Sequence, residues 1–167
     1  ALEVDIAAPA QPDAPRFRED LLFTHRGLSG PAVLQISSFW RPGTQVEIDL
    51  APGRRLENEW IDARPEARQQ LLTLLAASLP RRLAALWLER FGAVHPGVLR
   101  GTRIAEVGNR ALRELAASLQ RWSLHPSGTE GYRKAEATSG GVATAGLDPR
   151  TMQARAVPGL HFVGEVV

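Results

Sequence analysis

The hydrophobic pattern changes its period twice along the chain, and this change restricts the possible fold more than any other feature. Leu2–Ile6 and Val46–Leu50 alternate apolar and polar residues, which is the period of a half-buried strand. Between about 57 and 122, the apolar residues instead recur every three to four positions, as on the buried face of amphipathic helices. Strand-like segments return after Ser123. This order predicts an α+β fold in which a β-rich, barrel-like subdomain is interrupted by a small three-helix subdomain.

Leucine and tryptophan residues at helical spacing define three expected helices in the middle segment. These helices are expected over 64–78, Pro80–Gly92 and Asn109–Trp122. A further helix is expected to begin at Pro31, because proline is favoured in the first helical turn. Apart from the two alternating segments, short strands are expected over Leu21–Phe23, Leu124–Pro126, Arg133–Thr138 and Leu160–Gly164.

The domain boundaries follow from these changes of pattern. We predict that residues 1–56 and 123–159 form the β-rich subdomain and that residues 57–122 form the helical one. Residues 160–167 are predicted to begin a strand of another domain. Because the chain lacks an initial Met and stops in an apolar run, we expect it to be a fragment of a longer protein.

The charge and the cysteine count exclude several classes of site. The 20 Lys and Arg residues exceed the 18 Asp and Glu residues by two, and 19 of the 20 are arginine, so the pI of 9.9 reflects arginine chemistry. We therefore expect no nucleic-acid partner, and no apolar run is long enough for a membrane span. The absence of cysteine excludes thiolate catalysis and Cys-ligated metals. The four histidines lack metal-ligand spacing, so no metal site is predicted.

A glycine-rich loop, Thr24–Pro31, precedes the helix expected at Pro31. Free N–H groups at a helix start suit an anion or an oxyanion, although an ordinary helix cap is an equal alternative. Ser29 lies between Gly27 and Gly30, one residue short of a nucleophile elbow, so a serine hydrolase is a minor hypothesis.

Two glycine-containing segments near the C-terminus are typical of close contact with a flat ligand. Gly140 and Gly141 are adjacent and precede Val142, and glycine permits a backbone to approach a ligand without a Cβ clash. The apolar run that follows Gly159 ends in Gly164-Glu165. Ligands often bind at the carboxyl end of such a strand.

These segments together resemble one protein family. Thr24-His25-Arg26-Gly27-Leu28-Ser29-Gly30-Pro31 is similar to the signature Thr-His-x-Gly-x-Ser-Gly-Pro of the HI0933-like (BaiN-like) flavoproteins. The runs over 135–142 and 158–165 resemble that family's later blocks, which fumarate-reductase-type flavoproteins share more loosely. The resemblance extends over essentially the whole chain.

The resemblance implies the substrate-side insert, or cap, of a bacterial, cytoplasmic FAD-dependent oxidoreductase. The implied partners are the FAD-binding domain of the parent chain and a small molecule of unknown identity. The implied cofactor-binding residues are Gly140, Gly141, Val142, Gly164 and Glu165. The loop facing the substrate or an anion contains Thr24, His25, Gly27, Ser29 and Gly30. Catalytic residues stay undefined, with His25 and His161 as candidate proton donors.

The chain departs from this family in one respect that bears on activity. It has no Gly-x-Gly-x-x-Gly motif and therefore lacks a Rossmann-type domain. We expect the isolated chain neither to bind FAD tightly nor to be active, so its status as an enzyme is left open. The alternative function is a protein- or nucleic-acid-interaction module built on the helical subdomain. Four tryptophans are predicted to be core aromatics: Trp40, Trp60, Trp87 and Trp122.

Overall fold

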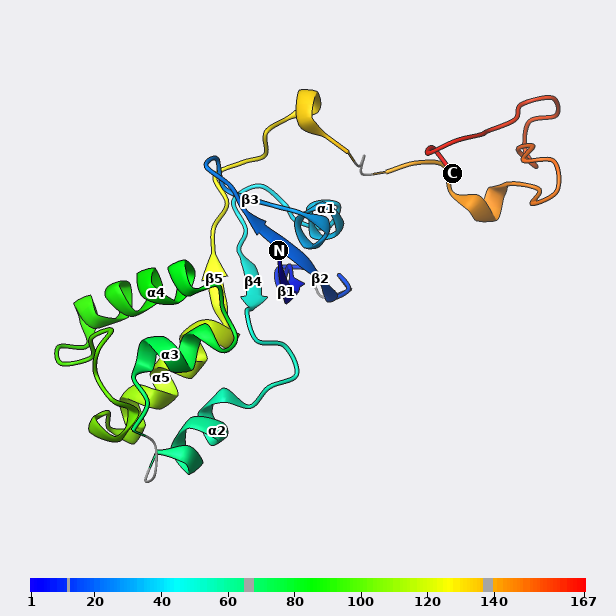
Figure 1. The fold of residues 1–167 in the computed structure, drawn as a ribbon. Coiled ribbons are helices and arrows are strands. Elements are labelled where there is room, and N and C mark those ends of the chain that lie inside the picture. Colours follow the sequence, from blue (N-terminus) through cyan, green and yellow to red (C-terminus); the bar gives the residue numbers. More distant parts are fainter. Residues whose placement is uncertain (12, 65–67, 137–139) are drawn as a thin grey trace. The chain divides into compact units, whose positions relative to one another are not determined.

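The computed structural model describes residues 1–11, 13–64, 68–136 and 140–167. Their contacts divide the chain into two compact units, Ala1–Thr129 and Glu130–Val167, and each is described by itself. The first unit contains a curled antiparallel sheet of five strands and five helices (Figure 1). The predicted α+β class, with a barrel-like part and a helical part, is confirmed. Within the described ranges, no helix is long and apolar enough to cross a membrane.

The sheet has the strand order β3-β2-β1-β4-β5, and every pair is antiparallel. Its strands are β1 (Leu2–Ala7), β2 (Phe17–Phe23), β3 (Leu28–Ser29), β4 (Val46–Asp49) and β5 (Trp122–Leu124). Alternation places Val4 and Ile6 of β1 on the buried face, where they join Leu21 of β2 and Ile48 of β4. The period-two segments therefore form the central strands, as predicted.

Helix α1 (Pro31–Ser37) follows β3 directly and begins where the sequence predicts. Gly30 is its N-cap, and Pro31 occupies the first helical position. Ala32 and Ile36 lie four residues apart on its buried face, which packs against β1 and β2. This helix covers the β2–β1 side of the sheet.

The helical part of the first unit contains four helices, where the sequence analysis expected three. They are α2 (Leu56–Ala63), α3 (Leu71–Ala76), α4 (Arg81–Val94) and α5 (Asn109–Gln120). The helices α4 and α5 confirm two predictions closely. The helix expected over 64–78 is wrong at its start, because α3 begins only at Leu71 and α2 ends at Ala63. Arg64 still has a right-handed helical backbone after the end of α2, and residues 65–67 of the expected helix lie outside the described ranges.

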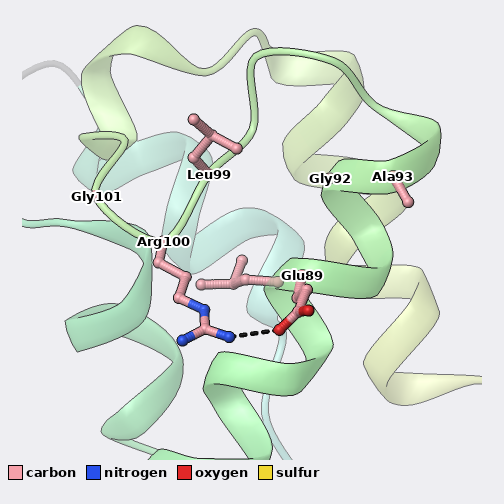
Figure 2. A pocket seen from close by; sticks show the side chains of 7 residues that line it. Glu89, Gly92, Ala93, Leu99, Arg100 and Gly101 are labelled. Atoms are coloured by element: carbon pink, nitrogen blue, oxygen red, sulfur yellow. Dashed lines mark hydrogen bonds and ion pairs between the residues drawn. The ribbon is translucent and has the colours of Figure 1, made fainter.

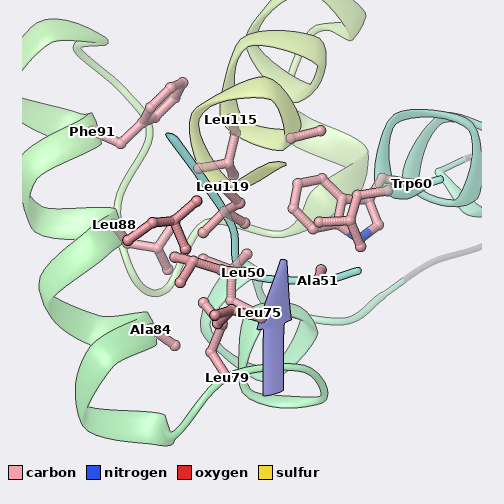
Figure 3. Packing of buried hydrophobic residues seen from close by; sticks show 14 of the residues in the cluster. Leu50, Ala51, Trp60, Leu75, Leu79, Ala84, Leu88, Phe91, Leu115 and Leu119 are labelled. Carbon is pink, nitrogen blue, oxygen red and sulfur yellow. The ribbon is translucent and has the colours of Figure 1, made fainter. Parts of the chain in front are cut away.

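The two parts of the first unit share one hydrophobic core. Leu50, which directly follows β4, is fully buried among Leu75, Leu88 and Leu119 of the helices (Figure 3). The N–H of Leu50 donates a hydrogen bond to the carbonyl of Leu119 at 3.0 Å. The end of β4 is therefore anchored to α5, and the sheet and helices fold around common residues.

The second unit, Glu130–Val167, is built mainly from turns. Among its described residues, only Leu147 is a buried hydrophobic residue. The carboxylate of Asp148 accepts hydrogen bonds from the N–H groups of Arg150 and Thr151, at 2.9 and 3.0 Å. Two 3-10 turns lie over Tyr132–Lys134 and Thr144–Gly146.

Both strands expected in this unit are wrong within the described residues. Tyr132–Lys134 is a 3-10 turn, and positions 137 and 138 of the expected strand lie outside the described ranges. Between 160 and 164, pairing is limited to a single bridge from His161 to Gln153. Gly159 and Gly164 adopt φ values of +82° and +83°, which form turns on both sides of the expected strand. The domain boundaries at 56, 122 and 159 stay a prediction.

Candidate functional site

Residues 24–27 form the tip of the β2–β3 hairpin, and Thr24, Arg26 and Gly27 form hydrogen bonds with one another within it. The Thr24 hydroxyl accepts hydrogen bonds from the N–H groups of Arg26 and Gly27, each at 3.2 Å. The Thr24 N–H donates to the Gly27 carbonyl at 2.8 Å. Two backbone N–H groups of this loop, those of Arg26 and Gly27, are thus already bound to Thr24 in this structure.

Gly30 is required by the packing of this loop against the sheet. Its φ is +93°, and a Cβ at this position would lie 2.7 Å from the carbonyl oxygen of Asp20 in β2. Ser29 is a strand residue that pairs with Leu22, so it does not occupy a nucleophile elbow. The substrate or anion role of Thr24, His25, Gly27, Ser29 and Gly30 stays a prediction.

Two of the predicted cofactor-binding segments lie against each other in the second unit. The N–H of Val142 donates to the carbonyl of Val166 at 2.7 Å. Gly141 has a φ of +137°, and a Cβ there would lie 2.8 Å from the same oxygen. The chain reverses between Gly164 and Val167, whose N–H donates to the Gly164 carbonyl at 3.3 Å. The Gly140–Val142 and Gly164–Val167 segments therefore form one structural feature, here called the glycine clamp.

Gly140 is the residue of the glycine clamp with free space beside its backbone. Its φ is +104°, and an added Cβ would meet no atom within 4 Å. Among the described residues the backbone of Gly140 therefore has free space beside it, whereas Gly141 is in contact with Val166. Glu165 is exposed within the turn. Residues 137–139, which complete the motif before Gly140, lie outside the described ranges.

The two candidate proton donors lie in different units. His161 is exposed, and its Nδ1 lies 2.9 Å from the carbonyl oxygen of Thr151. A carbonyl only accepts, so Nδ1 carries a proton and Nε2 is the ring nitrogen left for other chemistry. His25 is exposed at the hairpin tip. The catalytic role of either histidine stays a prediction.

A row of aromatic rings that sequence reasoning missed lies beside the hairpin. Phe23 of β2 stacks on Trp122 of β5, with ring centroids 6.2 Å apart and an angle of 17° between the rings. Trp122 also meets Trp87 of α4 edge-on, at 5.3 Å and 81°. Trp122 lies in a strand, although the sequence analysis placed it at the end of a helix. The helical spacing that continues to Trp122 gave no sign that α5 ends at Gln120.

Only one of the four tryptophans is fully a core residue. Trp60 is buried, whereas Trp40, Trp87 and Trp122 are half-buried and pack at the margin of the core. The indole N–H of Trp40 donates to the Thr44 carbonyl, and that of Trp87 donates to the Ser118 hydroxyl. These hydrogen bonds fix the orientations of the Trp40 and Trp87 indoles.

A shallow pocket lies between α4 and the turn at Leu99–Gly101 (Figure 2). Arg100 and Glu89 form an ion pair across it, and Leu88, Gly92 and Ala93 supply the remaining lining from α4. None of the predicted site residues lines this pocket. Among the described residues, no group of three or more His, Asp or Glu side chains is arranged to hold a metal ion.

Comparison with known proteins places the chain in a family. A protein-family model described as "HI0933-like protein barrel and H2TH domain" matches residues 3–137. The chain belongs to this HI0933-like family. The predicted family is thereby confirmed, and the family is associated with flavin in general.

Two curated relatives carry a specific name. The chain is 51% identical over 154 residues to the "Ribosomal RNA dihydrouridine synthase" of Escherichia coli (strain K12). It is 43% identical over 152 residues to the protein of the same name from Haemophilus influenzae (strain ATCC 51907 / DSM 11121 / KW20 / Rd). Each match covers 90% of this chain and 36% of the relative, so the chain spans about a third of the relatives' length.

These names contradict the predicted function. The predicted function, the insert of an FAD-dependent oxidoreductase with an interaction module as its alternative, does not agree with these names and is corrected. The description as a flavoprotein oxidoreductase fragment is corrected for the same reason. The motifs that carried the resemblance lie in the β2–β3 hairpin and in the glycine clamp, and they identified the family but not the activity named for the relatives.

Proposed function

We propose that this chain is part of a ribosomal RNA dihydrouridine synthase. The observation that carries this proposal is the identity of 43% and 51% to two proteins of that name over 90% of the chain. Because the chain spans only 36% of each relative, the activity is proposed for the whole protein that contains it.

Formation of dihydrouridine adds two electrons and two protons across the C5–C6 double bond of uracil. A hydride equivalent is added to one carbon and a proton to the other, so the reaction needs a reductant and an acid. A bound flavin would supply the two electrons, in agreement with the association of the family with flavin. The uracil must leave its stacked position in the RNA before protein groups can reach its double bond.

The glycine clamp fits the contact that a flat cofactor requires. Gly140 leaves its backbone open, while the hydrogen bond from Val142 to Val166 fixes the neighbouring backbone. We assign Gly140, Gly141, Val142, Gly164 and Glu165 to the flavin side of the site, and FAD is the proposed form. In this proposal the clamp orients the ring system and excludes water from one face.

His161 is the residue of the second unit best placed to hold a proton. Its hydrogen bond to the Thr151 carbonyl fixes the imidazole, so a proton gained by the ring is carried at Nε2. We propose that this nitrogen is the acid or relays its proton. His25 is the second candidate, because it lies at the exposed tip of the β2–β3 hairpin.

Ribosomal RNA replaces the small molecule of the sequence-based expectation as the proposed substrate. The formal charge of +2 gives no strong general field, but local clusters of arginine contact phosphate regardless of the net charge. The expectation of no nucleic-acid partner, which rested mainly on net charge, is therefore not carried forward. A ribosomal RNA substrate agrees with the cytoplasmic location expected from the sequence.

The test is complementation with the complete protein that contains this chain. It is produced in Escherichia coli lacking its own relative, and dihydrouridine is measured by mass spectrometry of digested ribosomal RNA. We expect dihydrouridine to return with the unchanged protein and to fall strongly with Gly141→Val, which inserts atoms against the Val166 carbonyl. Gly146→Ala is the matched control in the same unit, because its Cβ would meet no atom within 4 Å. Absence of dihydrouridine despite normal production of the unchanged protein contradicts the proposal.

A further inference from the structure

The row formed by Phe23, Trp122 and Trp87, here called the aromatic row, has no assigned role in the chemistry above. Phe23 exposes 44% of its surface, and the other two rings are half-buried. The contacts at 6.2 and 5.3 Å hold the three rings together, although they come from β2, β5 and α4. Rings fixed in this way, with Phe23 open to solvent, offer a platform on which another flat ring can stack.

Basic residues lie close in sequence to the three residues of the aromatic row. Arg90 is exposed and lies three residues after Trp87 on α4, which makes the two side chains neighbours on the helix surface. Arg121 is exposed and directly precedes Trp122. His25 and Arg26 follow Phe23 in the hairpin and are also exposed.

The carboxylates of α4 and α5 are paired with other groups. Glu89 of α4 pairs with Arg100, and Glu114 of α5 pairs with Arg110 and His95. Arg90 and Arg121 form no ion pair within the described part of the chain. The carboxylates of α4 and α5 are therefore paired, whereas Arg90 and Arg121, which lie close in sequence to Trp87 and Trp122, have no carboxylate partner among the described residues.

We propose that the aromatic row binds an unpaired base of the RNA substrate, with Arg90 and Arg121 contacting the adjoining phosphates. This inference rests on the proposed function and names a place on this chain where the RNA is held. Proteins bind single-stranded RNA through this combination, because every base has a face that stacks and every nucleotide has a phosphate. A protein partner would gain little from two unpaired arginines, so RNA is the occupant that the charges favour.

The experiment measures binding of a labelled oligouridylate of about 12 nucleotides to the 167-residue chain by fluorescence anisotropy. We expect Phe23→Ala to weaken binding roughly 5- to 100-fold, the range that loss of one base–aromatic stack gives. Arg90→Gln should weaken binding and reduce its dependence on salt. A fully base-paired RNA of equal length should bind less tightly, because its bases are not free to stack.

Matched controls separate the aromatic row from general effects. Phe39→Ala removes another exposed phenylalanine, 37% exposed and in contact with Phe17, that lies outside the row. Arg82→Gln removes another exposed arginine of α4. Both should bind RNA as the unchanged chain does. Circular dichroism and thermal melting of each variant establish that its fold is retained.

The outcomes distinguish this proposal from the proposed function. If Phe23→Ala binds normally, or if Phe39→Ala weakens binding equally, the aromatic row is not the RNA contact. Equal binding of paired and unpaired RNA also overturns the proposal, because it indicates phosphate contact alone. If RNA binds through the row but the complete protein forms no dihydrouridine, the proposed function fails while this inference stands.

Discussion

Phe23 stacks on Trp122 across the curled sheet, although β1 and β4 lie between their strands in the hydrogen-bonded order. No backbone hydrogen bonds join β2 to β5. The two strands are connected instead by the side chains of Phe23 and Trp122. Trp87 extends this contact to α4, so one group of rings connects the sheet with the helices. The same rings serve the structure and the proposed RNA surface.

The first prediction concerns the stability that this contact provides. Trp122→Ala should lower the free energy of unfolding by about 3 kcal/mol, because it removes a large side chain that packs at the margin of the core. Phe23→Ala should lower it by about 1 kcal/mol, since the ring is 44% exposed. Urea denaturation of both variants and of the double variant measures the coupling. Strictly additive losses would contradict an energetic contact between the two rings.

The second prediction concerns Gly30. Gly30→Ala should destabilise the first unit by more than about 1 kcal/mol, because it combines a φ of +93° with a Cβ 2.7 Å from the Asp20 carbonyl. Gly27→Ala has a φ of +146° but open space, so it carries the backbone strain alone. Gly101→Ala has neither feature and should leave stability nearly unchanged. Thermal melting ranks the three, and a Gly30→Ala variant as stable as Gly101→Ala would refute the packing argument.

Much of the first unit could be predicted because its signals are local. The alternation in β1 and β4 and the helical spacing in α4 and α5 each reflect one buried face. The prediction of one helix over 64–78 failed because the helical spacing of apolar residues continues between the end of α2 and the start of α3. The strand predictions in the second unit failed because an apolar run such as 160–164 forms a strand only where a neighbouring strand pairs with it.

The candidate site was predictable only in part, for a related reason. Adjacent glycines at 140 and 141 indicated a close approach, and the structure has one, but the approaching group at Gly141 is the Val166 carbonyl. The aromatic row could not be predicted, because Phe23, Trp87 and Trp122 are far apart in sequence and no local period connects them. Contacts between distant elements depend on the curvature of the sheet, which is a property of the assembled fold.

The third prediction concerns two facing carboxylates with opposite pKa shifts. Asp5 and Asp49 are cross-strand partners in β1 and β4. The hydrogen bonds from the Arg18 guanidinium, at 2.9 and 3.1 Å, lower the pKa of Asp5, whereas burial raises the pKa of Asp49. The stability that ionised Asp5 adds to the folded state is therefore present above its ordinary pKa of 3.8, and it is lost as the pH falls through the lowered pKa. For Asp49 the sign is opposite: the folded state is more stable below 3.8, and this stability is lost as the pH rises through the raised pKa.

Substitution by asparagine should consequently have opposite effects at the two positions. At pH 7, Asp5→Asn should destabilise the chain by less than about 1 kcal/mol, because its ion pair with Arg18 is partly exposed. Asp49→Asn should be neutral or stabilising, since its amide oxygen can still accept the hydrogen bond from the Ala51 N–H. Both differences in the free energy of unfolding, each between a variant and the unchanged chain, should vanish in acid. Urea titrations between pH 3 and 7 measure them, and a loss of the same sign for both variants would contradict the assignment.

The fourth prediction concerns the glycine clamp. Gly141→Ala should separate Val142 from Val166, because the new Cβ would lie 2.8 Å from the Val166 carbonyl. The Val142 N–H, which donates to that carbonyl at 2.7 Å, should then exchange with solvent at least about tenfold faster in hydrogen-exchange NMR. Gly140→Ala is the matched control, because it has a similar positive φ but no atom within 4 Å of the added Cβ. Equal exchange rates in the two variants would indicate that backbone strain at a positive φ, and not the clash with the Val166 carbonyl, opens the clamp.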